Sequence, residues 1–103
     1  MMNPQFKKGA LELCVLSQLV SVDRYGYELT DAISKEMVIA TGTLYLILKR
    51  LKDEEYLETY LVESGEGPAR KYYHLTEKGQ EYHKKLKEEW LEFVEVVNRI
   101  MNL

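Results

Sequence analysis

The residues best suited to bind a polyanion begin in the stretch TGTLYLILKR, residues 41–50. At about 100° per residue, a helix places Tyr45 and Lys49 opposite its buried leucines, on the same side as Gly42. A glycine at a helix start lets the backbone approach a phosphate, and the free N–H groups there favour an anion. Tyr45 can donate its hydroxyl to a phosphate, Lys49 adds a charge one turn later, and Arg50, on the flank, can reach a phosphate or a guanine edge. A solvated helix face with one stray tyrosine is the alternative.

A second basic stretch, GEGPARKYY, has a tip that contains glycine and proline and is followed at once by Arg70 and Lys71. If the flanking residues form a hairpin, these cations reach the minor groove or the flanking backbone of a duplex. An ordinary charged hairpin is the alternative. Lys7 and Lys8 offer a third basic contact, or else a solvated N-terminus.

Length and charge bound these interpretations. The chain has 103 residues, which indicates one domain with at most a small appendage. Its formal net charge of −3 does not by itself indicate that the protein binds nucleic acid. Local basic patches can still bind DNA, because salt limits repulsion from distant carboxylates to about 10 Å. The single cysteine, Cys14, excludes an internal disulfide and is interpreted as a small buried hydrophobe.

Catalytic and metal-binding patterns are absent from the sequence. Neither His74 nor His83 has a cysteine or an acid at ligand spacing, so no metal site and no cofactor are predicted. No phosphate-cradling glycine loop or nucleophile motif occurs, which makes an enzyme the weakest interpretation. No apolar run is long enough to span a membrane, and the N-terminus lacks a signal peptide, so a cytoplasmic protein is expected.

The elements that must position the basic stretches follow from periodicity. Helices are predicted at residues 8–20, 25–36 and 41–55, strands at 56–64 and 70–76, and a last helix at 76–101. The third helix begins at Thr41 as N-cap and buries Leu44, Ile47, Leu48 and Leu51. This order predicts a mainly α (α+β) fold, a winged helix-turn-helix with a long C-terminal helix. Residues 1–76 would be the DNA-binding domain and 77–103 the dimerisation helix.

The last helix has an apolar second half that a small domain cannot cover. Its apolar residues step by four and three in the manner of a coiled-coil seam, which predicts a homodimer. The expected dimer interface comprises Leu86, Trp90, Phe93, Val94, Val97 and Ile100. Trp90 and Phe93 are also the predicted effector-binding residues, since two tryptophans near a two-fold axis form a slot for planar apolar compounds. Alternatively, Trp90 only fills interface volume.

The stretches FKKGALELCVLSQL, DRYGYEL, GTLYLILKRLKDEEYLE and GPARKYYHLTEKG together resemble the PadR family of transcriptional repressors, over nearly the whole chain. The resemblance implies a dimeric winged-helix DNA-binding protein whose last helix is the dimerisation arm. The single short arm resembles a smaller subgroup of multidrug-responsive repressors, in which a tryptophan after an acidic pair, here Trp90 in EEW, lines a drug-binding pore between subunits.

The same resemblance assigns DNA contacts, including one from Tyr27 to the backbone. The residues expected to contact DNA are Lys8, Tyr27, Thr43, Tyr45, Lys49, Arg50, Arg70 and Lys71. Two positions depart from the family pattern: Leu46 and Ala69 stand where prolines are usual. Leu46 then either meets a thymine methyl or weakens binding, and Ala69 leaves the wing looser.

The function predicted from the sequence is a dimeric, sequence-specific repressor of a pseudo-palindromic operator on double-stranded DNA. A small planar apolar or drug-like effector bound between the subunits would release it. The alternative is a protein-interaction winged helix that has lost DNA binding, which the net charge of −3 and Leu46 favour.

Overall fold

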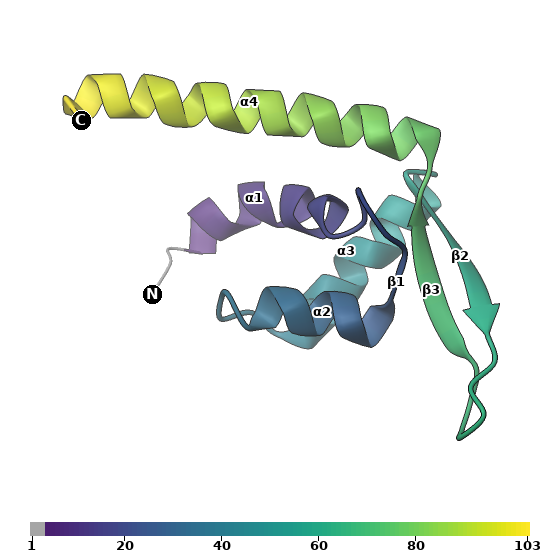
Figure 1. The fold of residues 1–103 in the computed structure, drawn as a ribbon. Coiled ribbons are helices and arrows are strands. Elements are labelled where there is room, and N and C mark those ends of the chain that lie inside the picture. Colours follow the sequence, from purple (N-terminus) through teal and green to yellow (C-terminus); the bar gives the residue numbers. More distant parts are fainter. Residues whose placement is uncertain (1–3) are drawn as a thin grey trace.

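The computed structural model describes residues 4–103, with side chains described from residue 10 onward. The described residues form α1 (Pro4–Ser17), β1 (Arg24–Tyr25), α2 (Gly26–Ser34), α3 (Thr41–Asp53), β2 (Leu57–Val62), β3 (Arg70–Leu75) and α4 (Glu77–Met101) (Figure 1). The predicted order of three helices, a hairpin and a final helix is confirmed, as is the mainly helical α+β class with a winged helix-turn-helix. Element ends differ from the predicted ones by a few residues, as helix ends commonly do.

The core lies where the first three helices meet the base of the hairpin. The first three helices, the turn after α1 and the two hairpin strands contribute apolar side chains that are less than a tenth exposed: Leu11, Val15, Leu16, Leu19, Leu29, Ile33, Leu44, Leu48, Leu51, Leu57, Tyr73 and Leu75. From the predicted buried face of α3, Leu44, Leu48 and Leu51 are completely buried, and Ile47 packs against the core from its edge. This burial fixes the rotation of α3, so its opposite face must point outward.

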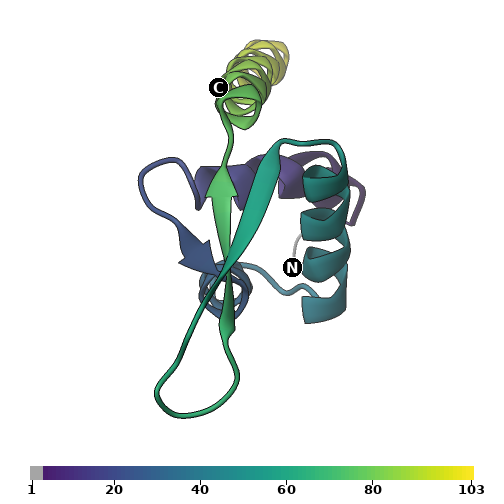
Figure 2. The same ribbon diagram turned by 90° about the vertical axis from the view of Figure 1, so that its right-hand side faces the viewer.

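The sheet has three antiparallel strands in the order β1-β3-β2. The β2–β3 register runs from Leu57 opposite Leu75 to Val62 opposite Arg70, so both strands are paired along their full length. We call β2, β3 and the connecting residues 63–69 the wing. The wing projects away from α4, beyond α2 and α3 (Figures 1 and 2).

Strand β1 was not predicted from the sequence. The sequence predicted that one helix ends at residue 20 and the next begins at residue 25, yet Arg24 pairs with Tyr73 and Tyr25 with Tyr72. Two residues are too few to show a period of two. Their extended conformation depends on the ladder that β3 offers, which only the folded chain provides.

The sequence predicted that Thr76 begins α4 and that Thr41 caps α3, and the structure confirms only the first of these two predictions. Thr76 is confirmed at the start of α4, where it is the N-cap: its hydroxyl oxygen accepts from Gly79 N at 3.0 Å and donates to Glu55 O at 2.8 Å. The prediction that Thr41 caps α3 is wrong, because Ala40 occupies the N-cap and Thr41 is already helical. Residues Met37 and Ile39 before it pack against the core, so the connector enters the helix one residue earlier.

Helix α4 lies along α1 and extends past it to the C-terminus (Figure 1). Only Gly79 among its residues is buried. Large apolar side chains in its second half are exposed, at 40% for Trp90, 59% for Phe93 and 75% for Ile100. Within residues 4–103, none of the helices combines the length and hydropathy needed to cross a bilayer.

Candidate nucleic-acid interface

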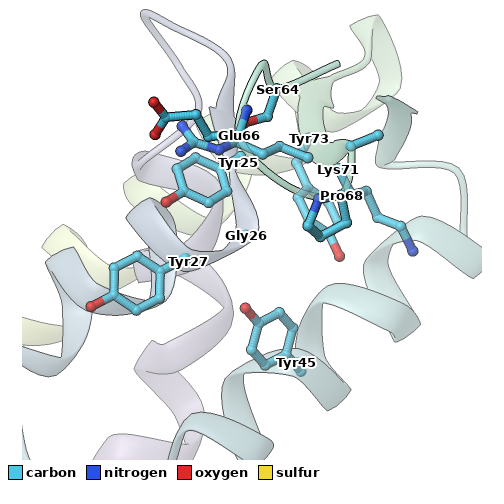
Figure 3. A pocket seen from close by; sticks show the side chains of 11 residues that line it. Tyr25, Gly26, Tyr27, Tyr45, Ser64, Glu66, Pro68, Lys71 and Tyr73 are labelled. Atoms are coloured by element: carbon cyan, nitrogen blue, oxygen red, sulfur yellow. The ribbon is translucent and has the colours of Figure 1, made fainter. Parts of the chain in front are cut away.

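An open cleft lies between the start of α2, the first turns of α3 and the wing (Figure 3). Its volume is about 510 Å³. The lining residues are Tyr25, Gly26, Tyr27, Tyr45, Ser64, Glu66, Pro68, Ala69, Arg70, Lys71 and Tyr73. Four of the residues expected to contact DNA therefore share one surface: Tyr27, Tyr45, Arg70 and Lys71. They come from three elements that are distant in sequence, and we call this surface the cleft.

Tyr45 lies across the start of α2. A Cβ added to Gly26 would be 3.1 Å from Tyr45 Cε1 and 3.2 Å from its hydroxyl oxygen, so a larger residue would require the ring to shift by a few tenths of an ångström. Figure 3 shows the ring of Tyr45 directed toward Gly26, with Tyr73 nearby. Tyr45 is 41% exposed, so one side of the ring packs on the protein and the other faces the cleft.

The outer face of α3 is open as predicted. A Cβ on Gly42 would meet nothing within 4 Å, and Thr43 beside it is exposed. Leu46 is 70% exposed. Lys49 Nζ donates to Asp53 Oδ2 at 2.9 Å, and this hydrogen bond is the main cause that raises the pKa of Lys49. An exposed ion pair one turn apart contributes little net stability, so a phosphate can displace it easily.

Arg50 points away from the cleft, toward α1. Its Nη2 donates to Glu12 Oε2 at 2.6 Å, and its Nη1 lies 3.6 Å from Glu54 Oε2. The other oxygen of Glu12 accepts from Tyr82 in α4 at 2.8 Å, so one carboxylate joins three helices. Burial, followed by this hydrogen bond, raises the pKa of Tyr82 to about 12. The structure thus separates Arg50 from Tyr45 and Lys49 and gives it a role in helix packing.

In the wing, Arg70 is held by an aromatic surface. Its guanidinium lies 4.7 Å from the ring centroid of Tyr25. That ring belongs to a row in which neighbouring centroids are 5.6–6.2 Å apart. The tyrosine row consists of Tyr27, Tyr25, Tyr72 and Tyr60. A cation over a tyrosine ring is favourable by about 0.5–1 kcal/mol at an exposed site, so the row positions Arg70 at the rim of the cleft.

The far end of the row is fixed by a polar cluster. Tyr60 donates its hydroxyl to Asp23 Oδ2 at 2.6 Å, and His74 Nδ1 lies 2.7 Å from Asp23 Oδ1. The hydrogen bond to Tyr60 is the largest cause that lowers the pKa of Asp23. The same bond raises the pKa of Tyr60 to about 12. The cluster ties β2 and β3 to the residue before β1 and braces the base of the wing.

Sequence reasoning missed several of these residues. Tyr25, Asp23 and Glu12 gave no signal, because their partners lie far along the chain. Facing tyrosines on the two strands follow from the hairpin register, so the pair Tyr60–Tyr72 was within reach of a period-two argument. The predicted contact Lys8 lies outside the residues whose side chains are described.

A second concave surface lies between α1 and α4. Its volume is about 540 Å³, and its lining is almost wholly apolar. The lining residues are Ala10, Leu13, Cys14, Met37, Trp90, Phe93, Val94, Val97 and Asn98. We call it the apolar groove. The predicted effector residues Trp90 and Phe93 meet there, with ring centroids 6.4 Å apart, and half-burial raises the pKa of the Cys14 thiol.

The described part of the chain contains no candidate metal site. Among the residues that the structure describes, no group of three or more histidine, cysteine, aspartate or glutamate side chains is placed to hold a metal ion. His74 and His83 instead bond to neighbours, His83 Nε2 lying 2.9 Å from Ser17 Oγ. Because Ser17 donates its own proton to Leu13 O at 2.7 Å, its oxygen accepts from His83.

Comparison with known proteins gives consistent matches. The model of the transcriptional regulator PadR-like family matches residues 15–85. A protein from Lysinibacillus sphaericus, described as uncharacterized protein X, is 33% identical over 105 residues, which is 98% of this chain and 96% of that protein. The crystal structure of a PadR-like transcriptional regulator from Bacillus cereus superimposes with a TM-score of 0.84 at 36% identity, covering 94% of this chain and 96% of its own. A transcriptional regulator from Clostridium thermocellum has a TM-score of 0.85 at 31% identity, with 96% and 97% covered.

Proposed function

Because this chain belongs to the PadR-like family of transcriptional regulators, we propose that it is a homodimeric, sequence-specific repressor that binds a pseudo-palindromic operator. The single observation that carries the proposal is the cleft. There, phenols from α2 and α3 and two cations from the wing converge on one open surface, beside a helix start that carries no side chain at Gly42. Such a combination of hydrogen-bond donors, positive charge and free backbone N–H groups fits a phosphate backbone.

In the proposed complex, the first turns of α3 enter the major groove, as the second helix of a helix-turn-helix does. The hydroxyls of Tyr27 and Tyr45 donate to phosphates beside the groove, and Thr43 lies at the helix start. Lys49 leaves Asp53 to bind a phosphate one turn later. Arg70 and Lys71 follow the backbone toward the minor groove. We assign a packing role to Arg50, since Glu12 already binds its guanidinium.

The proposed dimer is formed by the second half of α4, and residues 1–76 then form the DNA-binding part of each subunit. Leu86, Val94 and Val97 are partly covered within the monomer, whereas Trp90, Phe93 and Ile100 present an uncovered seam. A second α4 related by a two-fold axis would cover this seam. Two copies of α3 would then meet half-sites about 34–36 Å apart, one helical turn of DNA.

We further propose that a planar apolar effector binds in the apolar groove and releases the repressor. The groove has the apolar walls and the size that suit an aromatic ligand, and its walls come from α1 and α4. A ligand that separates these helices would change the spacing of the two recognition helices, and with it operator affinity. As a DNA-binding repressor, the protein would act in the cytoplasm.

The first test measures DNA affinity against salt. Titration of the DNA upstream of its own gene should give a steep negative slope of log K against log salt, since several phosphate contacts release counterions. Lys49→Ala and Arg70→Ala should each reduce the slope by about one unit. Lys84→Ala, an exposed lysine on α4, is the matched control and should leave the slope unchanged. Absence of binding at about 50 mM salt, or a flat slope, would remove the proposal.

The second test addresses the arm. Light scattering should show a dimer at micromolar concentration, and Phe93→Glu should shift it to monomer by placing charges on the seam. A wild-type protein that is monomeric at that concentration would contradict the dimer. For the effector, Trp90 emission should change on addition of planar aromatic drugs or phenolic acids, and a panel that leaves the emission unchanged refutes the groove as their site.

A further inference from the structure

The most exposed large apolar side chain of α3 is an aliphatic one. Leu46 is 70% exposed, whereas Leu44 and Leu48, two residues on either side, are completely buried. Two residues correspond to about 200° around a helix, so Leu46 points directly away from the core. Among the residues whose side chains the structure describes, no packing explains an aliphatic side chain at this position.

The side chain of Leu46 lies nearer the N-terminus of α3 than its own Cα does. A helical side chain leans toward the N-terminus and covers the turn before its own Cα. The residue four positions earlier is Gly42, where even an added Cβ would meet nothing within 4 Å. Leu46 is therefore an exposed apolar group beside the first turns of α3, the part of the helix that enters the major groove in the proposed complex.

The residues beside Leu46 restrict the kind of surface that its side chain can contact. Tyr45 on one side and Lys49 on the other carry groups that bind phosphate, which suits DNA and not an apolar protein surface. A leucine neither donates nor accepts a hydrogen bond. The apolar group that base pairs present in the major groove is the 5-methyl of thymine. Any polar base edge covered by Leu46 would lose water without gaining a partner.

We infer that Leu46 is a specificity-determining residue that reads a thymine 5-methyl group in each operator half-site, an inference that rests on the proposed function. It selects thymine by burying the methyl group and rejects other bases by desolvating their polar edges. Burial of one methyl is worth about 0.8 kcal/mol, which corresponds to about a fourfold change in affinity per half-site. Two half-sites in a symmetric dimer then give about a 15-fold change.

The experiment removes that methyl group alone. The tightest-binding duplex selected from a random-sequence library is remade with each thymine replaced in turn by deoxyuridine, which pairs with adenine and lacks only the methyl. Kd is measured at fixed salt for the wild type and for Leu46→Ala. One thymine per half-site should weaken the wild type about fourfold when replaced. The same replacement should have no effect on Leu46→Ala.

Controls separate this inference from its premise. Val20→Ala trims another exposed aliphatic side chain, in the turn after α1, and should retain the full response to uracil. Leu46→Asn should shift the preferred base at that position from thymine toward adenine, which asparagine binds with two hydrogen bonds. A uracil scan that affects wild type and Leu46→Ala equally at every thymine overturns the inference, while the DNA-binding function stands. Failure of the unmodified duplex to bind overturns the proposed function itself.

Discussion

Gly79, in the first turn of α4, should not tolerate the smallest possible side chain. An alanine Cβ there would lie 2.1 Å from Tyr56 O and 2.7 Å from Leu75 Cδ1. Real Cβ atoms essentially never approach another heavy atom within 3.0 Å, so the helix and the carbonyl must separate by at least 0.9 Å, the difference between 3.0 and 2.1 Å. Gly79→Ala therefore tests how closely α4 joins the base of the wing.

The magnitude follows from what holds the carbonyl in place. Tyr56 O accepts from Thr76 N at 3.1 Å, and displacement weakens this bond, which is worth about 1 kcal/mol. Overpacking adds about 1–3 kcal/mol, and the higher helix propensity of alanine returns about 1 kcal/mol. The expected net loss of stability is about 1–3 kcal/mol, or a fall in Tm of at least about 4 °C.

Urea unfolding followed by circular dichroism, at one fixed protein concentration, measures this change. Gly42→Ala is the matched control, because its Cβ would enter open space. There the ordinary helix preference for alanine should stabilise the protein by up to about 1 kcal/mol. The same variant should weaken DNA binding, since the new methyl group stands between the helix start and a phosphate. If Gly79→Ala proves as stable as the wild type, the close junction of α4 with residue 56 is refuted.

Three further outcomes are expected. Glu12→Gln should lower the free energy of unfolding by about 1–3 kcal/mol in urea, because Arg50 loses a charged acceptor; an unchanged midpoint contradicts the three-helix junction. Burial lowers the pKa of His83 below its ordinary 6.5, so the unfolded chain binds that proton more readily and stability falls as pH drops below 6.5. Thermal melts of His83→Gln should lose that part of the pH dependence, and a slope identical to the wild type's argues against it. Asp53→Asn should strengthen DNA binding about twofold at low salt by releasing Lys49, whereas weaker binding would exclude Lys49 as a phosphate contact.

Much of the fold was predictable because it rests on local periodicity. The spacing of Leu44, Leu48 and Leu51 identified the buried face of α3, and therefore also the outward face that carries Tyr45 and Leu46. The change from a helical to an alternating pattern placed the hairpin, and the strand pairing confirms it. Which face of a helix or strand is buried depends on the spacing of apolar residues within that element, so the sequence of the element alone predicts it.

The candidate site was predictable only in part. The cleft unites Tyr27, Tyr45, Arg70 and Lys71, which the sequence had proposed as contacts from separate stretches. Arg50 was proposed as a DNA contact from the flank of α3, and the structure shows its guanidinium bonded to a carboxylate 38 residues away in the chain, which helical spacing could not reveal. Helical spacing gives the direction of a side chain and does not say which neighbouring element will meet it.

The sequence by itself determined the order of all elements except β1, the faces that the first three helices bury and the apolar seam of α4, since each depends on residues a few positions apart. Tertiary structure alone decided that β1 pairs with β3, that Arg70 lies on Tyr25, and that Glu12 links three helices. These contacts join residues up to 70 positions apart, and their geometry is fixed only by the angles at which the helices and the wing pack together.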